Sequence, residues 1–149
     1  EVNENTSYPV VHDIPFEKKY QRIKGVGASM RLGAYDCILK PETLMYDIYD
    51  KHKAFKDKKT HLISARHRHR YEVNNAYLDV LAEKGIVFSG TSPDDFFVEM
   101  LELPKSMHPF FVATQAHPEY KSKPLKAHPI FIEYLKAVSQ NAQTKLKKK

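Results

Sequence analysis

Five short runs of strand-forming residues, separated by turn-forming or lysine-rich stretches, dominate the central part of the chain. In chain order they are Ser29–Leu39, His61–Val73, Ile86–Ser89, Phe96–Leu103 and Phe110–Thr114. The turn residues Ser92–Asp95 predict a hairpin that ends in the fourth run, and Gly33 predicts a kink or bulge in the first. We expect the last run to be buried, because it is short and apolar. This pattern predicts a strand-rich α/β or α+β fold.

Three amphipathic segments predict the helices that flank these strands. Pro41 suits the first turn of one helix, Asn74 or Asn75 caps a second over Ala76–Lys84 that ends at Gly85, and the third begins near Pro129. Their inward faces are Leu44, Met45, Ile48 and Tyr49; Tyr77, Leu78 and Leu81; and Ile130, Phe131, Tyr134, Leu135 and Val138. Residues 1–20 predict an irregular lead-in, which an apolar set could pin to the core: Val10, Val11, Ile14 and Phe16.

Length and composition narrow the class of protein. A chain of 149 residues suggests one domain, and 42% hydrophobic with 28% charged residues is ordinary for a folded, soluble protein. No apolar run approaches the roughly 18–20 residues of a membrane-spanning helix. A single cysteine excludes an internal disulfide and a cysteine-based metal site. The chain begins at Glu1 without a signal-like leader, so we expect a cytoplasmic protein and a piece of a longer one.

The net charge of +6 is concentrated in two runs. One is Lys51–Lys59, which predicts a surface loop, and the other is the lysine-rich end, which predicts a fraying tail. No stacking aromatic residues and no nucleic-acid-binding motif accompany this charge. We therefore expect no nucleic-acid partner.

The segment QAHPEY, Gln115–Tyr120, follows the apolar strand directly and is the first candidate for catalysis. Pro118 disfavours a helical conformation for His117, and in an extended segment His117 and Glu119 point to the same side. A carboxylate beside an imidazole fixes its tautomer and raises its basicity, as a nucleophile-activating base requires. The competing interpretation is a plain His-Pro turn with a surface glutamate.

The run RHRHRYEVN, Arg66–Asn74, is the second candidate. On a strand its arginines share one face and its histidines the other, which suits an ion-pair ladder or a site for a substrate carboxylate. The His-x-His pair would need at least one further ligand to hold a metal. Cys37 is a weaker candidate, because a nucleophile elbow needs small residues on both sides of the cysteine and Asp36 and Ile38 flank this one.

Four motifs in fixed order carry a resemblance to a known family: Ser29–Cys37 (SMRLGAYDC), Arg66–Asn74 (RHRHRYEVN), Phe88–Asp94 (FSGTSPD) and Phe111–Tyr120 (FVATQAHPEY). Together they closely resemble the C-terminal part of the CTP synthase family, within its class I glutamine amidotransferase domain. The resemblance runs from about Val10 to Val138. It implies an α/β fold, namely part of a class I glutamine amidotransferase-like mixed β-sheet with flanking helices.

The resemblance implies a glutaminase joined to a synthase that uses ATP and Mg²⁺ to aminate UTP to CTP. A Cys–His–Glu triad of the family hydrolyses L-glutamine, and ammonia passes to the synthase. By motif position His117 matches the base, Glu119 the residue that orients it, and Arg70 a residue that holds the substrate glutamine. No cofactor or metal is expected in this part. The implied partner is the synthase domain of the same protein, a homotetramer in the family, with no membrane.

The family nucleophile lies in a glycine-rich elbow, and no Gly-x-Cys-x-Gly occurs here. Residues 1–149 are therefore expected to be the C-terminal portion of an amidotransferase domain, without nucleophile segment or synthase domain, and inactive alone. Cys37 matches a non-catalytic position. Ala116 replaces a usual aromatic residue, and Val26–Ser29 departs from the usual Gly-Gly-Thr. The alternatives are a non-catalytic amidotransferase-like interaction module, a related amidotransferase or glutamyl hydrolase, and a basic RNA-binding fragment.

Overall fold

The computed structural model describes residues 3, 5–13 and 30–147. Its main sheet has five strands in the order β3-β2-β5-β6-β7, and every pairing between described neighbours is antiparallel. The strands are β2 (Arg31–Leu39), β3 (Leu62–His69), β5 (Val87–Thr91), β6 (Val98–Leu103) and β7 (Phe111–Thr114). A two-stranded sheet pairs β1 (Val11–Asp13) with β4 (Tyr71–Val73). The helices are α1 (Leu44–Lys51), η2 (Asn75–Tyr77), α2 (Leu78–Glu83), η3 (Pro118–Lys121) and α3 (Pro129–Leu146).

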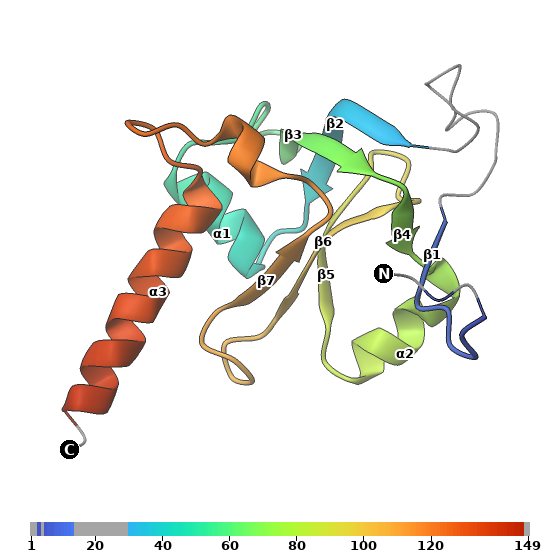
Figure 1. Ribbon diagram of the computed structural model, residues 1–149. Helices are drawn as coiled ribbons and strands as arrows, with labels where there is room; N and C mark the ends of the chain where they lie inside the picture. The colour runs from blue at the N-terminus through green and yellow to red at the C-terminus, as the bar shows by residue number, and fades with distance from the viewer. Residues whose placement is uncertain (1–2, 4, 14–29, 148–149) are drawn as a thin grey trace.

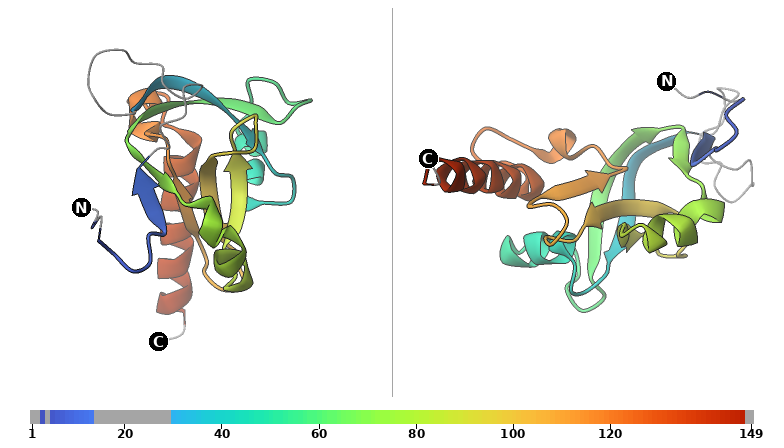
Figure 2. Two further views of the ribbon diagram at one scale, coloured as in Figure 1. Left: turned by 90° about the vertical axis from the view of Figure 1, so that its right-hand side faces the viewer. Right: turned by 90° about the horizontal axis from the view of Figure 1, so that it is seen from below.

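The helices lie at opposite ends of the main sheet (Figures 1 and 2). Helices α1 and α3 pack together at one end, and α2 lies with the small sheet at the other. The main sheet curls, so that η3, which follows the edge strand β7, reaches the opposite edge strand β3. Two hydrogen bonds fasten this contact: His117 N donates to Arg66 O at 2.7 Å, and Lys121 Nζ donates to Ser64 O at 2.5 Å. The curl therefore brings segments from both edges of the sheet together at one place.

The hydrophobic core lies between the sheet and α1. Its buried members are Cys37, Leu39, Ile63 and Met100 of the sheet, Met45, Ile48 and Tyr49 of α1, and Ile130 of α3. The predicted inward face of the first helix is thus confirmed for three of its four residues, and Leu44 is partly buried against the cluster. Pro41 lies in the turn before the helix, whose N-cap is Thr43. The first backbone N–H groups of α1 donate to the side chain of Thr43 and to a buried carboxylate of β6. The helix begins at Leu44, so Pro41 is not part of its first turn, contrary to the prediction from the sequence.

Most predicted strands and turns are confirmed. Gly33 sits inside β2 with φ of +108°, a conformation that glycine adopts without strain. Asn74 accepts a hydrogen bond from Ala76 N at 3.0 Å and caps the second helical segment, which ends before Gly85 with φ of +94°. The hairpin between β5 and β6 turns through residues 92–95 as expected.

The strand predicted over His61–Val73 is instead two strands, broken at Arg70. The partner strand β2 begins at Arg31, which pairs with His69. Beyond His69, β3 therefore has no residue of β2 with which to pair. The chain turns there and pairs as β4 with β1. The lead-in predicted to be irregular contains this strand β1, while Ile14 and Phe16 lie outside the described residues.

Two burial predictions are wrong. Strand β7 lies at the edge of the sheet, not inside it, and Phe111 is 42% exposed. In α3 only Ile130 is buried, whereas Tyr134, Leu135 and Val138 are 48–64% exposed. The reason is visible in Figure 2: α3 packs on α1 near its start and then projects past the sheet.

The charged runs differ slightly from expectation. Lys51 is the last residue of α1, and the rest of the run lies in turns. Helix α3 continues to Leu146, so Lys145 is helical where a fraying tail was predicted, and Lys148 and Lys149 lie outside the described residues. None of the described helices is long and apolar enough to cross a membrane.

Candidate active site

The segment that carries His117 leaves the carboxyl end of β7 through a tight turn. Ala116 N donates to Thr114 Oγ1 at 3.1 Å, and His117 has φ of −105° and ψ of 85°. Pro118 then begins η3, because its fixed φ suits the first position of a helical turn. The extended geometry predicted for this segment therefore stops at His117. The pairing of His117 with Glu119 arises from the helical turn, not from a shared strand face.

His117 and Glu119 form a hydrogen-bonded pair. His117 Nδ1 lies 2.7 Å from Glu119 Oε1. Because an ionised carboxylate only accepts, Nδ1 carries the proton and Nε2 keeps its lone pair. The same hydrogen bond lowers the pKa of Glu119. The side chains are 36% and 53% exposed, so an incoming proton donor can approach the imidazole.

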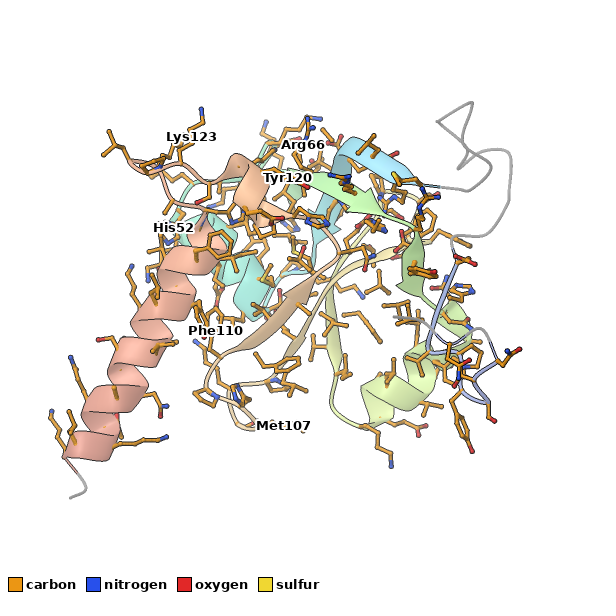
Figure 3. The ribbon with its side chains drawn as sticks, in the orientation of Figure 1. His52, Arg66, Met107, Phe110, Tyr120 and Lys123 are labelled. Carbon is orange, nitrogen blue, oxygen red and sulfur yellow. The ribbon has the colours of Figure 1, made fainter. Side chains whose placement is uncertain are left out.

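The imidazole is held on a second side by an aromatic ring. The rings of His117 and Tyr120 are stacked, with 5.2 Å between centroids and 17° between planes. Tyr120 and Arg66 lie at the same end of the molecule (Figure 3), in keeping with the bond from His117 N to Arg66 O. Backbone, carboxylate and ring contacts thus fix the orientation of His117, which is what a general base requires.

Arg70 lies in the break between β3 and β4 and is half-buried. Its side chain has no hydrogen bond and no ion pair to any residue that the structure describes. The next residue is tied to the His117 segment, since Gln115 Nε2 donates to Tyr71 O at 2.6 Å. The structure therefore brings the backbone beside Arg70 and the segment of His117 into direct contact, and leaves the guanidinium available for an anion. Sequence reasoning overlooked Gln115, although it belongs to the motif QAHPEY.

The alternation predicted for the arginine–histidine run is confirmed for its strand part. Arg66 and Arg68 are exposed, and His67 and His69 point inward. An ion-pair ladder is contradicted, because none of the three arginines of the run pairs with a carboxylate in the described part of the chain. His67 Nδ1 and His69 Nε2 bond each other at 2.9 Å. Among the described residues no group of three or more His, Cys, Asp or Glu side chains is placed to hold a metal ion.

The buried ion pairs belong to a different arginine. Arg31 Nη1 donates to Glu72 Oε1 at 3.1 Å, and Nη2 donates to Glu99 Oε1 at 2.5 Å. All three residues are at most 3% exposed, and the guanidinium lies over the rings of Tyr35 and Phe97. The expectation that buried arginines meet carboxylates was sound, but it was applied to the wrong arginines. The available signal was Glu99, a charged residue inside an apolar strand.

Burial sets the protonation of this cluster. It raises the pKa of Glu72 to about 8, and that of Glu99 as well, although Arg31 opposes both changes. Burial, followed by the charge of Arg31, lowers the pKa of His67 to about 3 and that of His69 to about 4. The pKa of Arg31 is raised, because the hydrogen bonds and charges of the two carboxylates outweigh its own desolvation. At neutral pH the two histidines are therefore neutral.

Cys37 lies in the middle of β2, fully buried and paired with Ile63 of β3. Burial raises the pKa of its thiol well above the usual range, and the charge of Glu99 acts in the same direction. A thiol in this state is not the reactive thiolate that a nucleophile must supply.

The α/β fold carries a hydrogen-bonded His–Glu pair on the turn after its edge strand β7. Residues 10–137 match the family of class-I glutamine amidotransferases. The chain therefore belongs to this family, and its α/β fold is the one expected from the sequence.

Within the family, the similar proteins are CTP synthases. The CTP synthase of Methanosphaera stadtmanae is 49% identical over 143 residues, and that of Methanothermobacter thermautotrophicus is 43% identical; each match covers 96% of this chain and 24% of the relative. The glutaminase domain of Trypanosoma brucei CTPS, solved with bound acivicin, matches with a TM-score of 0.73 and 31% identity over 93% of this chain and 48% of that chain. The chain thus spans about a quarter of the length of the curated relatives that it matches.

Proposed function

We propose that this chain supplies the general base and part of the substrate site of a glutaminase, which serves a CTP synthase in the natural protein that carries this sequence. The observation that carries the proposal is the 2.7 Å hydrogen bond between His117 Nδ1 and Glu119 Oε1. Family membership and the similarity to CTP synthases and to a glutaminase domain support it. Ammonia released from glutamine would then aminate UTP in an ATP-dependent reaction elsewhere in the protein.

The proposal gives a role to each of three residues. His117 Nε2 takes the proton of a cysteine thiol, and the thiolate attacks the side-chain amide carbon of glutamine. His117 returns that proton to the departing nitrogen, so that ammonia leaves and a thioester forms. His117 then deprotonates a water, which cleaves the thioester and releases glutamate. Glu119 orients the imidazole throughout, and Arg70, whose guanidinium has no described partner, binds the substrate carboxylate.

The nucleophile in this proposal is not Cys37. Its thiol is fully buried in the sheet and its pKa is raised, so it can neither reach glutamine nor ionise readily. A cysteine from outside these 149 residues supplies the thiolate, together with the donors that stabilise the tetrahedral intermediate. Each such donor is worth about 3–4 kcal/mol. The isolated chain is therefore expected to hydrolyse no glutamine above background.

Two measurements test the proposed function. In the natural protein, His117→Ala should abolish glutamine-dependent CTP formation and leave ammonia-dependent formation intact, since ammonia bypasses the glutaminase step. His108→Ala, a change at the other end of β7 in an exposed loop, is the matched control and should affect neither activity. A non-catalytic interaction module would instead show no difference between the two variants. Rapid ammonia release by the purified 149-residue chain, lost on His117→Ala, would contradict the assignment of the nucleophile.

A further inference from the structure

The carbonyl of Tyr71 accepts two hydrogen bonds from side chains. Gln115 Nε2 donates at 2.6 Å from the segment after β7, and His69 Nδ1 donates at 3.2 Å from the end of β3. A carbonyl oxygen has two lone pairs and only accepts, so both side chains must present an N–H group to it. This peptide is therefore held from both sides at the point where β3 gives way to β4.

The bond from His69 fixes the tautomers of the buried histidines. Because His69 carries its proton on Nδ1, its Nε2 accepts, and His67 Nδ1 must donate to it across 2.9 Å. His67 Nε2 is then left as an acceptor, and Glu99 Oε2 lies 3.6 Å away. The lowered pKa values of both histidines agree with two neutral rings. These hydrogen bonds anchor the Tyr71 carbonyl to the two inward-pointing histidines, His69 and His67.

Gln115 joins that anchored peptide to the segment of the base. Its own backbone N–H donates to Glu99 O at 2.9 Å, so its backbone is fixed on β6 while its side chain reaches β4. Arg70 precedes Tyr71 directly, and His117 follows Gln115 by two residues. The residue is thus bonded both to the backbone next to Arg70 and to strand β6.

We propose that Gln115 is a positioning residue of the glutaminase site, which holds the backbone next to Arg70 at a fixed place relative to His117 through its bond to the Tyr71 carbonyl. Gln115 takes no part in proton transfer. Its bond sets where the guanidinium meets the substrate carboxylate, and misplacing a binding group by about 1 Å can cost up to about 100-fold in rate. This inference rests on the proposed glutaminase function.

The test uses Gln115→Glu in the natural protein, because this change keeps the shape and removes the N–H donor. We expect the KM for glutamine to rise about tenfold or more, with a smaller change in kcat. Ammonia-dependent CTP formation and the melting temperature should stay close to those of the unchanged protein. Gln115→Met, which also lacks a donor but adds no charge, should raise the KM similarly and covers the case in which the carboxylate variant does not fold. Gln140→Glu makes the matched change on the exposed surface of α3 and should leave every measurement unchanged.

The outcomes are distinguishable. A KM for glutamine within twofold of normal in both Gln115 variants would overturn the inference. Equal losses of the glutamine-dependent and ammonia-dependent activities would also overturn it, because they would indicate a purely structural role. An unchanged protein that forms CTP from ammonia but never from glutamine would overturn the proposed function, and this inference with it. The imidazole ¹⁵N shifts of His69 give a separate check, since they should report a proton on Nδ1; a proton on Nε2 would contradict the second anchor.

Discussion

The state of each histidine near the site is decided by its neighbours, not by its place in a motif. His67 and His69 are enclosed in the sheet, bonded to each other, and kept neutral. His117 is partly exposed, and its Nδ1 lies 2.7 Å from a carboxylate oxygen of Glu119. Of these three side chains, that of His117 is the most exposed to solvent, and this difference is invisible in a sequence that shows all three as histidines beside charged residues.

The burial of Cys37 leads to a prediction at this scale. In the natural protein, Cys37→Ala removes a buried thiol and should lower the free energy of unfolding by roughly 1 kcal/mol, because the cavity left behind is small. Glutamine-dependent turnover should stay within about twofold of normal, since the thiol takes no part in the chemistry. Denaturant unfolding and steady-state rates check the two halves. Turnover reduced by orders of magnitude in a folded variant would make Cys37 the nucleophile.

Sequence reasoning reached the contact between His117 and Glu119 because the two residues are only two positions apart, although it expected an extended segment where the structure has a helical turn. It could not reach Gln115 or Arg31, because their partners lie 44, 41 and 68 residues away along the chain. Such contacts depend on which strands pair, and a strand pattern alone does not fix that order.

At the scale of elements, the start of α1 depends on another strand. Glu102 of β6, only 4% exposed, accepts hydrogen bonds from Leu44 N and Met45 N at 2.6 and 2.9 Å. A carboxylate is well placed at a helix N-terminus, where unpaired N–H groups and the helix dipole favour negative charge. The sequence showed a helix after Pro41 but gave no sign that its first turn is capped from 58 residues away.

Glu102→Gln tests this cap. One amide oxygen can replace only one carboxylate oxygen, and the amide NH₂ would face the second backbone N–H. We expect the free energy of unfolding to fall by about 1–3 kcal/mol, the cost of an unsatisfied buried donor. Urea unfolding measures it, and Glu83→Gln on the exposed end of α2 should change stability by less than about 0.5 kcal/mol. Equal stabilities of the two variants would show that α1 does not need the cap.

Helix and strand boundaries agree with the sequence-based prediction where neighbouring residues determine them. They differ from it where the pairing of distant strands determines them. Asn74 acts on its own neighbours, and its cap was predicted correctly, whereas the register of β2 with β3 runs through Gly33 without the bulge that was considered there. The break at Arg70 and the exposure of Phe111 follow from where the partner strand begins and from which strand lies at the edge. One face of α3 is exposed because the helix extends past the sheet. The spacing of apolar residues within α3 does not reveal where the sheet ends.

For the molecule as a whole, the buried cluster couples stability to pH. The pKa of Glu72 is about 8 in the folded protein, but a carboxyl in the unfolded chain titrates near its ordinary 4.5. Between these values the folded state holds the extra proton, so stability falls as the pH rises through about 8. His67 and His69 act in the opposite sense, because the unfolded chain takes up their protons below pH 6.5 and the folded protein does so only near 3 and 4.

Glu72→Gln should make the alkaline decline shallower. The amide keeps an oxygen for Arg31 Nη1 but has no proton to lose. Between pH 6.5 and 8.5 the unchanged protein should lose stability by up to about 1.4 kcal/mol per pH unit for this one proton, and the variant should lack that contribution. Unfolding free energies measured across this range provide the test. Identical slopes in the two proteins would contradict the assignment of the proton to Glu72.

The hydrogen bond from His117 N to Arg66 O has a consequence for solubility. Strand β3 is an edge of the sheet, and its outward carbonyls would otherwise offer a template on which a second chain could add a strand. The turn that carries His117 covers this edge, and Lys121 Nζ donates a second hydrogen bond to Ser64 O. Any change that detaches the turn would therefore also uncover an aggregation-prone strand. The few peptide groups that hold the His117 turn in place are thus also the ones that cover the edge strand.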